Sequence, residues 1–132
     1  MSDYRVRVAT PDDVDVLVHQ RIAMFQDMGV PLDTAAVSAA FRPWLLDMMP
    51  AGTYRAWVVE SGSQVIAGGG ITILPWPPGP QYFSGRLAFV YNVYTEPDHP
   101  HRGLGRMVME AIHAWCRTEG IGSLALNASR FG

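Results

Sequence analysis

The chain has 132 residues, of which 48% are hydrophobic and 17% charged, so we expect one domain over residues 1–132 with its own core, and this composition excludes a disordered chain. A formal net charge of -2 argues against a nucleic-acid partner, and no apolar stretch is long enough to span a bilayer, which argues against a membrane protein. Because Cys116 is the single cysteine and the first residues lack the apolar core of a signal peptide, we expect a soluble cytoplasmic protein.

The first predicted elements are a strand and two helices. Residues 4–9 alternate polar and apolar side chains, which is typical of a half-buried strand. Residues 10–13, Thr-Pro-Asp-Asp, then begin a helix, because threonine can cap it, proline suits its first position and acids suit its positive end. A second helix is predicted from about residue 33 to residues 50–52, and Pro43 should kink it or split it in two.

Three strands are predicted next. Residues 54–60 and 65–74 are separated by a short turn and should form a hairpin. Three glycines at 68–70 inside the second of these strands predict a bulge, or a large group packed close to the backbone. A proline-rich loop at 75–81 leads to a long strand over residues 85–95.

The clearest predicted helix covers residues 104–119. Leu104, Val108 and Ile112 recur at four-residue spacing and form an apolar stripe on it. Residues 124–127 read as a last strand. The order β-α-α-β-β-β-α-β indicates an α/β fold with a mixed sheet and flanking helices.

Residues 102–106, Arg-Gly-Leu-Gly-Arg, open this helix shortly after the long strand. Amides in the first turn of a helix have no internal partner and the helix dipole adds positive charge, so the stretch predicts an anion site with phosphate as the usual occupant. A tight turn that merely needs glycine explains the same residues about as well. A Walker loop and a dinucleotide-binding glycine pattern are both absent, which leaves a pyrophosphate at a helix start as the nucleotide hypothesis.

The stretch NVYTEPDHPHRGLGRMV, residues 92–108, resembles the motif of the GNAT acyltransferases, the GCN5-related N-acetyltransferases. That family has a long strand ending in V-x-P, followed by [RQ]-x-x-G-x-[GA] at the start of a helix. Val93, Thr95 and Pro97 fit the strand end, and residues 103–105 fit the glycine part. Since the order of strands and helices also matches, the resemblance covers essentially the whole chain.

The resemblance implies an acyl-CoA N-acyltransferase (GNAT-like) fold and transfer of an acetyl group from acetyl-CoA to a primary amine on a small molecule or peptide. It implies that the strand backbone at Val93, Tyr94 and Thr95 binds the pantetheine arm of acetyl-CoA. The acceptor pocket would be built from the first two helices. Backbone amides would cradle the pyrophosphate, and they belong to Arg102, Gly103, Leu104, Gly105 and Arg106.

Two features depart from the family pattern. Pro100 stands where the family has Arg or Gln, which removes a backbone donor and a polar side chain, so Arg102 or His101 would have to substitute. The sequence ends at residues 129–132, where the family usually continues with a further helix, a general-acid tyrosine and closing strands. An uncovered sheet edge at residues 122–132 would recruit another chain, so we expect a homodimer.

Glu96 and Asn92 are the candidate residues for chemistry and acceptor contact. A carboxylate beside the expected thioester can take the proton that the amine must lose, directly or through water, so Glu96 is the candidate general base. A solvated loop acid is an equally good interpretation of Glu96. Asn92 should contact the acceptor, although a bulge can reset which side chains face it. His99 and His101 form an HxH without a spaced carboxylate or cysteine, so no metal site is expected.

Two other functions are consistent with the sequence. Pro100 and the early end of the chain favour a non-catalytic acyl-CoA-binding or regulatory domain. A subunit whose main role is assembly through an open sheet edge is the other alternative. Binding of acetyl-CoA would distinguish the enzyme and the binding domain from the assembly subunit. Release of a free thiol with an amine would distinguish the enzyme from the binding domain.

Overall fold

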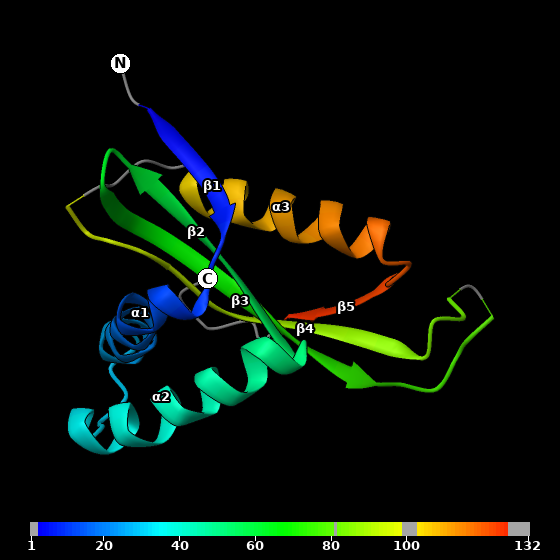
Figure 1. The fold of residues 1–132 in the computed structure, drawn as a ribbon, viewed down its shortest axis with the longest axis horizontal. Coiled ribbons are helices and arrows are strands. Elements are labelled where there is room, and N and C mark those ends of the chain that lie inside the picture. The colour runs from blue at the N-terminus through cyan, green and yellow to red at the C-terminus, as the bar shows by residue number, and fades with distance from the viewer. Residues whose placement is uncertain (1–2, 81, 99–102, 127–132) are drawn as a thin grey trace.

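The computed structural model describes residues 3–80, 82–98 and 103–126, and within these ranges the centre of the fold is a five-stranded mixed sheet (Figure 1). The strand order is β1-β2-β3-β4-β5, antiparallel except for the parallel pair β4 and β5. The strands are β1 (Tyr4–Val8), β2 (Tyr54–Ser61), β3 (Gln64–Pro75), β4 (Arg86–Thr95) and β5 (Ser123–Leu126).

Helices cover both faces of this sheet. A short 3-10 turn, η1 (Pro11–Asp13), leads into α1 (Val14–Asp27), and α1 and α2 (Thr34–Ala51) lie on one face, with α3 (Leu104–Thr118) on the other (Figure 1). The predicted order of strands and helices and the mixed sheet are therefore confirmed. Within the described ranges, no helix combines the length and the hydropathy that a membrane crossing needs.

The start of the first helical segment is fixed by the side chains that the sequence pattern singled out. Thr10 Oγ1 accepts a hydrogen bond from the Asp12 amide, and the Asp13 carboxylate accepts one from the Thr10 amide at 2.8 Å. Arg7 of β1 donates two further bonds of 2.8 Å to the same carboxylate, and its guanidinium holds the pKa of Asp13 below the usual range. This arrangement ties β1 to the helix that follows it.

The second helix does not split at Pro43. Asp33 caps α2 by accepting a bond from the Ala36 amide at 3.1 Å, and the helix continues unbroken to its end. Pro43 lies on the exposed side, where water can satisfy the carbonyl that loses its helical donor. Phe41 and Leu45 on either side of it are buried, so their packing holds the helix together.

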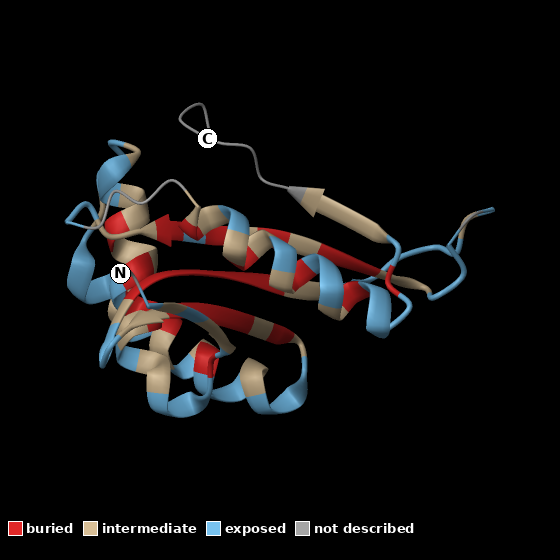
Figure 2. Ribbon diagram, turned by 90° about the horizontal axis from the view of Figure 1, so that it is seen from above, coloured by how far each residue is buried: buried red, intermediate tan, exposed pale blue. Residues whose placement is uncertain are grey.

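The core has two layers, one on each face of the sheet (Figure 2). On the α3 side, Leu104, Val108 and Ile112 have no exposed surface, which confirms the predicted stripe. The other layer lies between the sheet and the first two helices. It contains the buried side chains of Leu17, Val18, Phe41, Leu45, Tyr54, Ala56 and Val58.

The glycines at 68–70 are explained by close packing as well as by a bulge. A Cβ on Gly69 would lie 2.8 Å from Cγ1 of Val108 on α3, closer than side chains pack. On the opposite face, the side chain of Gln20 from α1 occupies the space beside Gly68, and that of Tyr54 from β2 occupies the space beside Gly70. Side chains therefore approach the β3 backbone from both faces, and glycine is required to let them do so.

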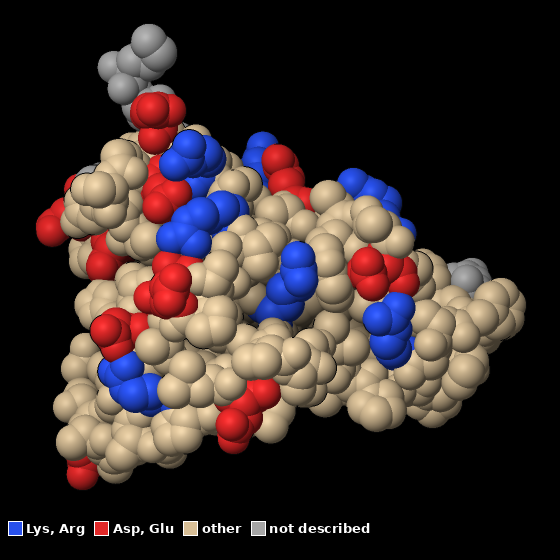
Figure 3. All heavy atoms as spheres, in the orientation of Figure 1, with Lys and Arg blue, Asp and Glu red and all other residues tan. Residues whose placement is uncertain are grey.

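Charged side chains are interspersed over the face of the molecule shown in Figure 3, where arginines and acids alternate. That face therefore has no extended patch of one sign. The pairs include Arg7 with Glu60, at 3.2 Å, and Arg42 with Asp15.

We expect Gly69→Ala to lower the free energy of unfolding by about 1–3 kcal/mol, because the added methyl group overpacks against Val108. Urea denaturation followed by tryptophan fluorescence measures the effect. Gly79→Ala is the matched control, since a Cβ there meets no atom within 4 Å, and it should stay within about 0.5 kcal/mol of the parent. Equal, small effects in the two variants would contradict the packing argument.

Candidate functional site

A bulge in β4 determines the geometry of the candidate site. The pairing of β4 with β3 shifts register here, so Asn92 and Val93 together lie opposite Gly69. Asn92 has a φ of 62°, in the left-handed region that residues other than glycine seldom adopt. As a result two successive side chains, Tyr91 and Asn92, both contact Arg21 of α1, and the usual alternation of strand side chains is reset.

Asn92 is held from two directions. Its Nδ2 donates to the hydroxyl of Tyr54 at 3.0 Å, and Arg21 donates to its Oδ1 at 2.5 Å. Asn92 is 6% exposed, and burial raises the pKa of Tyr54 well above its ordinary value. The structure thus gives the predicted acceptor-contact residue two protein partners, which stabilise a backbone conformation that costs about 1–3 kcal/mol. Its contact with an acceptor stays a prediction.

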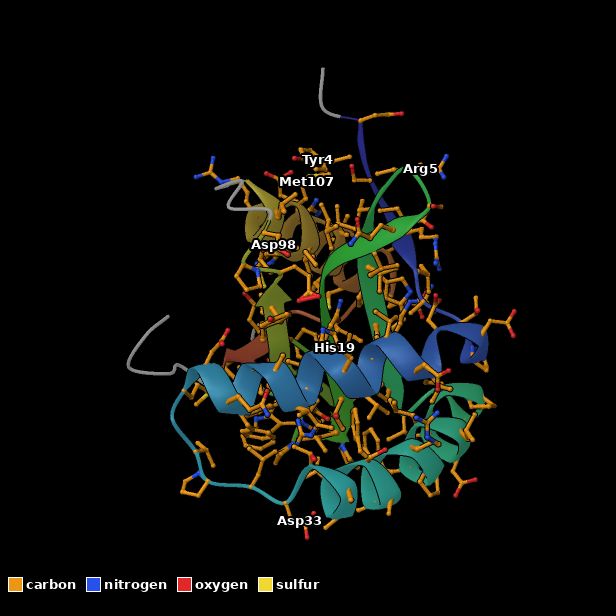
Figure 4. All side chains as sticks on the ribbon, turned by 90° about the vertical axis from the view of Figure 1, so that its left-hand side faces the viewer. Tyr4, Arg5, His19, Asp33, Asp98 and Met107 are labelled. Carbon is orange, nitrogen blue, oxygen red and sulfur yellow. The ribbon has the colours of Figure 1, made fainter. Side chains whose placement is uncertain are left out.

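A pocket of about 340 Å³ lies between α1, α2 and β4. It was expected that the first two helices would build the acceptor site, and this pocket is formed largely by them. Figure 4 shows α1 lying across the sheet with α2 beyond it and side chains reaching into the space between the two helices. The pocket is lined by Arg21, Phe25, Val37, Ala40, Phe41, Trp44 and Tyr91.

Glu96 follows β4 and pairs with a histidine of α1. Its carboxylate lies 2.9 Å from Nε2 of His19, which Figure 4 labels on that helix, and its backbone N–H donates to the carbonyl of Ile66 at 2.8 Å. The side chains of His19 and Glu96 are 54% and 23% exposed, so a proton taken up by the pair can pass to solvent. The sequence analysis missed His19, because only the fold brings it beside a residue 77 positions later.

The strand edge near this pair is where the pantetheine arm is predicted to bind, and that contact stays a prediction. The described part of β5 pairs with residues 87–90 of β4, and Val93 is 38% exposed. Within the described ranges, residues 91–95 therefore have a strand neighbour only on the β3 side. Tyr94 turns inward, where its ring meets that of His19 edge-on at 6.3 Å.

The first turn of α3 leaves backbone donors without acceptors. No side chain caps this helix at Gly103, whereas Thr10 and Asp33 cap the two earlier helical segments. The first helical bond is donated by Met107 to the Gly103 carbonyl, at 2.9 Å. The amides of residues 104–106 thus have no helical acceptor, and nothing in the described part of the chain accepts from them.

The same turn has room for an anion. Among the described residues, no atom lies within 4 Å of a Cβ built on Gly105, so packing against this part of the chain does not require glycine there. Arg106 is exposed, and among the described residues it has no ion pair, while Leu104 is fully buried and anchors the turn. Unpaired amides, the positive helix end and an exposed arginine together fit a pyrophosphate.

Several residues of the sequence-based site lie outside the described residues. They are Arg102, which was predicted to bind the pyrophosphate, Pro100, His99 and His101. Residues 127–132 of the predicted dimer edge also lie outside them. Among the described residues, no group of three or more potential ligands could hold a metal ion.

The chain resembles known acetyltransferases in sequence and in structure. Residues 20–130 match the model of the acetyltransferase (GNAT) family. The crystal structure of a GCN5-related N-acetyltransferase from Ralstonia eutropha JMP134 is 31% identical and has a TM-score of 0.86, covering 98% of this chain and 86% of that chain. Among curated proteins, none matches.

Two more distant structures share the fold. A predicted acetyltransferase from Clostridium acetobutylicum, solved with acetyl-CoA, is 22% identical with a TM-score of 0.85, covering 98% of this chain and 84% of that one. An aminoglycoside N-acetyltransferase in complex with CoA is 14% identical with a TM-score of 0.76, covering 99% and 80%.

The stability of the fold should fall as the pH rises above about 10. Burial, with a smaller effect of the Glu96 carboxylate, raises the pKa of Tyr94 to about 12, and burial raises the pKa of Tyr54 and Tyr91 as well. The folded protein therefore keeps protons that the unfolded chain releases near pH 10. This stabilisation is complete below pH 10 and is lost as the pH rises through 12.

Urea denaturation at a series of pH values checks this expectation. Tyr94→Phe removes one of the shifted groups, so the variant should lose less stability than the parent between about pH 9 and 11.5. Tyr82→Phe is the control, because Tyr82 is 49% exposed, and it should follow the parent curve. A Tyr94→Phe curve parallel to that of the parent would show that Tyr94 does not hold its proton as argued.

Proposed function

The chain belongs to the acetyltransferase (GNAT) family, and we propose that it transfers an acetyl group from acetyl-CoA to a primary amine. The observation that carries this proposal is the uncapped first turn of α3. Among the described residues, the amides of residues 104–106 have no acceptor, and no atom lies within 4 Å of a Cβ built on Gly105. A pyrophosphate there would satisfy the amides and lie at the positive end of the helix dipole.

Acetyl-CoA would be held by two stretches of the chain. The backbone of Val93, Tyr94 and Thr95 offers the pantetheine arm a strand edge to pair with. The amides of residues 102–106, with the side chain of Arg106, would cradle the pyrophosphate. Bound acetyl-CoA supplies an activated thioester, and the structures solved with acetyl-CoA and with CoA support the assignment.

The pair of His19 and Glu96 would act as the base. In the reaction the amine nitrogen would form a bond to the acetyl carbon and lose a proton, while the carbon–sulfur bond of the thioester breaks and CoA leaves as its thiol. The carboxylate of Glu96, which accepts a hydrogen bond from Nε2 of His19 at 2.9 Å, can take up this proton directly or through water and release it to solvent. Holding both reactants beside β4 would supply much of the remaining rate enhancement.

Release of CoA thiol with a panel of primary amines tests the function, with the product identified by mass spectrometry. The chain contains no lysine, so acetylation of its own lysine side chains cannot produce the signal. Amine-dependent thiol release with a matching acetylated product supports the proposal. Calorimetric binding of acetyl-CoA without transfer to any amine would identify a non-catalytic acyl-CoA-binding domain, and absence of binding would contradict both functions.

A cytoplasmic location and a homodimer with residues 122–132 in the interface belong to the same proposal. The strand that contributes to this edge, β5, pairs with β4 through Leu87 to Val90.

Gly105→Asp should weaken acetyl-CoA binding at least tenfold, about 1.4 kcal/mol, because it places bulk and negative charge against the pyrophosphate. Calorimetry measures the affinity. Ala114→Asp adds the same charge to an exposed position of α3 away from its first turn and should leave the affinity unchanged. Unchanged affinity in a folded Gly105→Asp protein would exclude this turn as the pyrophosphate site.

Glu96→Gln should lower kcat with little change in acetyl-CoA affinity, because the variant keeps the shape of the side chain but cannot act as a base. Steady-state rates across pH, with Glu110→Gln as an exposed-acid control on α3, check it. An active Glu96→Gln enzyme with the parent pH profile would return Glu96 to the role of a solvated acid.

A further inference from the structure

The pocket between α1, α2 and β4 contains a cation without an acidic partner. Arg21 lines it, and among the described residues no carboxylate forms an ion pair with this guanidinium. Some other arginines are paired, as Arg5 and Arg7 are with Glu60, whereas Arg55 and Arg106 have no ion pair among the described residues. A cation that is partly withdrawn from water and left unpaired is costly, so its position calls for an explanation.

Arg21 has hydrogen-bond donors to spare. One of its N–H groups donates to Oδ1 of Asn92 at 2.5 Å, and a guanidinium carries several more. In the described part of the chain, the buried side-chain nitrogens without a partner belong to Gln20 and Arg55. The remaining donors of Arg21 are therefore not sealed inside the protein, and they face the pocket that this side chain lines.

Aromatic rings hold the guanidinium in place. It lies 4.9 Å from the ring centroids of Phe25 and Phe41 and 5.7 Å from that of Tyr91. These contacts stabilise the charge and fix its direction. Apolar walls have a low dielectric constant, which strengthens the attraction of the guanidinium for an anion entering the pocket.

The other walls of the pocket select the rest of the ligand. Apart from Arg21, the lining side chains are aliphatic or aromatic, and the volume of about 340 Å³ is near the lower end of that for small-molecule sites. One positive charge matches one carboxylate, in the planar geometry that a guanidinium binds best. A phosphate dianion would call for a second cation, which the lining does not provide.

We infer that this pocket binds the acceptor through a carboxylate on Arg21, and that the acceptor is a small amine with a carboxylate and an apolar or aromatic side chain, of the class of α-amino acids. The acetylation of that amine rests on the proposed function, whereas the binding of the carboxylate does not. Because Arg21 is bonded to Asn92, which precedes the proposed pantetheine edge, a carboxylate held there keeps a nearby amine close to β4. A polycationic acceptor is disfavoured, since Arg21 would repel it.

Ligand pairs that differ only in the carboxylate test the inference in the parent protein. Phenylalanine and 2-phenylethylamine share the ring and the amine, and phenylalanine should have at least a tenfold higher kcat/KM for CoA release. 3-Phenylpropionate has the carboxylate and the ring but no amine. It should bind in calorimetry without acetyl-CoA and should compete with the amine substrate.

Variants of Arg21 supply the second test. Arg21→Gln should raise KM for phenylalanine at least tenfold and abolish binding of 3-phenylpropionate, while the affinity for acetyl-CoA stays within twofold of the parent. Arg21→Lys keeps the charge and should retain part of the preference for the carboxylate. Arg117→Gln removes an exposed arginine from α3 and should change none of these values. Thermal unfolding verifies that each variant is folded.

The outcomes separate this inference from the proposed function. Equal kcat/KM for phenylalanine and 2-phenylethylamine, or a preference for a polycationic aminoglycoside, would overturn the inference while leaving acetyl transfer intact. If no amine is acetylated, the proposed function fails, and binding of 3-phenylpropionate that depends on Arg21 would still support the carboxylate site. Absence of that binding in the parent protein would overturn the inference, whatever the catalytic result.

Discussion

The geometry of the site depends on one extra residue in β4. Because Asn92 and Val93 share a single partner in β3, Tyr91 and Asn92 turn toward the same pair of helices, and Val93 turns toward α3. Gly69 faces this bulge, and Val93 and Val108 of α3 leave no room for a side chain there. Without this change of alternation, the pocket would lose either its aromatic wall or the residue that anchors its cation.

The bulge and the cation stabilise each other. A left-handed asparagine and a partly desolvated guanidinium are each unfavourable alone. In this fold the Asn92 carboxamide accepts from Arg21 and donates to the buried hydroxyl of Tyr54, so one polar chain satisfies three groups inside an apolar layer. After donating to Asn92, Arg21 keeps further N–H groups that can donate to a ligand. A fold optimised only for stability would place an apolar side chain at residue 21, or a carboxylate beside its guanidinium.

Local patterns predicted the scaffold well and the side-chain pairs poorly. The cap at Thr10, the stripe on α3 and the close packing against the glycines at 68–70 depend on neighbours in sequence or on a residue type with one structural meaning, so the sequence was sufficient to find them. The bulge itself lies in β4, opposite Gly69. The continuity of α2 through Pro43 depends on packing, which propensity does not contain. The pairs of His19 with Glu96 and of Arg21 with Asn92 join residues 77 and 71 positions apart, and no motif marks either partner.

Two anion sites of different kind flank the reacting centre that we propose. At the start of α3 the positive charge comes from backbone amides and a helix dipole in an open turn, which suits a pyrophosphate that stays largely hydrated. In the pocket the positive charge comes from one guanidinium among aromatic rings, which suits a ligand with a single carboxylate and an apolar side chain. β4 runs between them, with Tyr91 at the pocket and Val93, Tyr94 and Thr95 at the proposed pantetheine edge. The strand therefore fixes the separation of the two bound molecules, and the bulge at Asn92 determines which of its residues face each one.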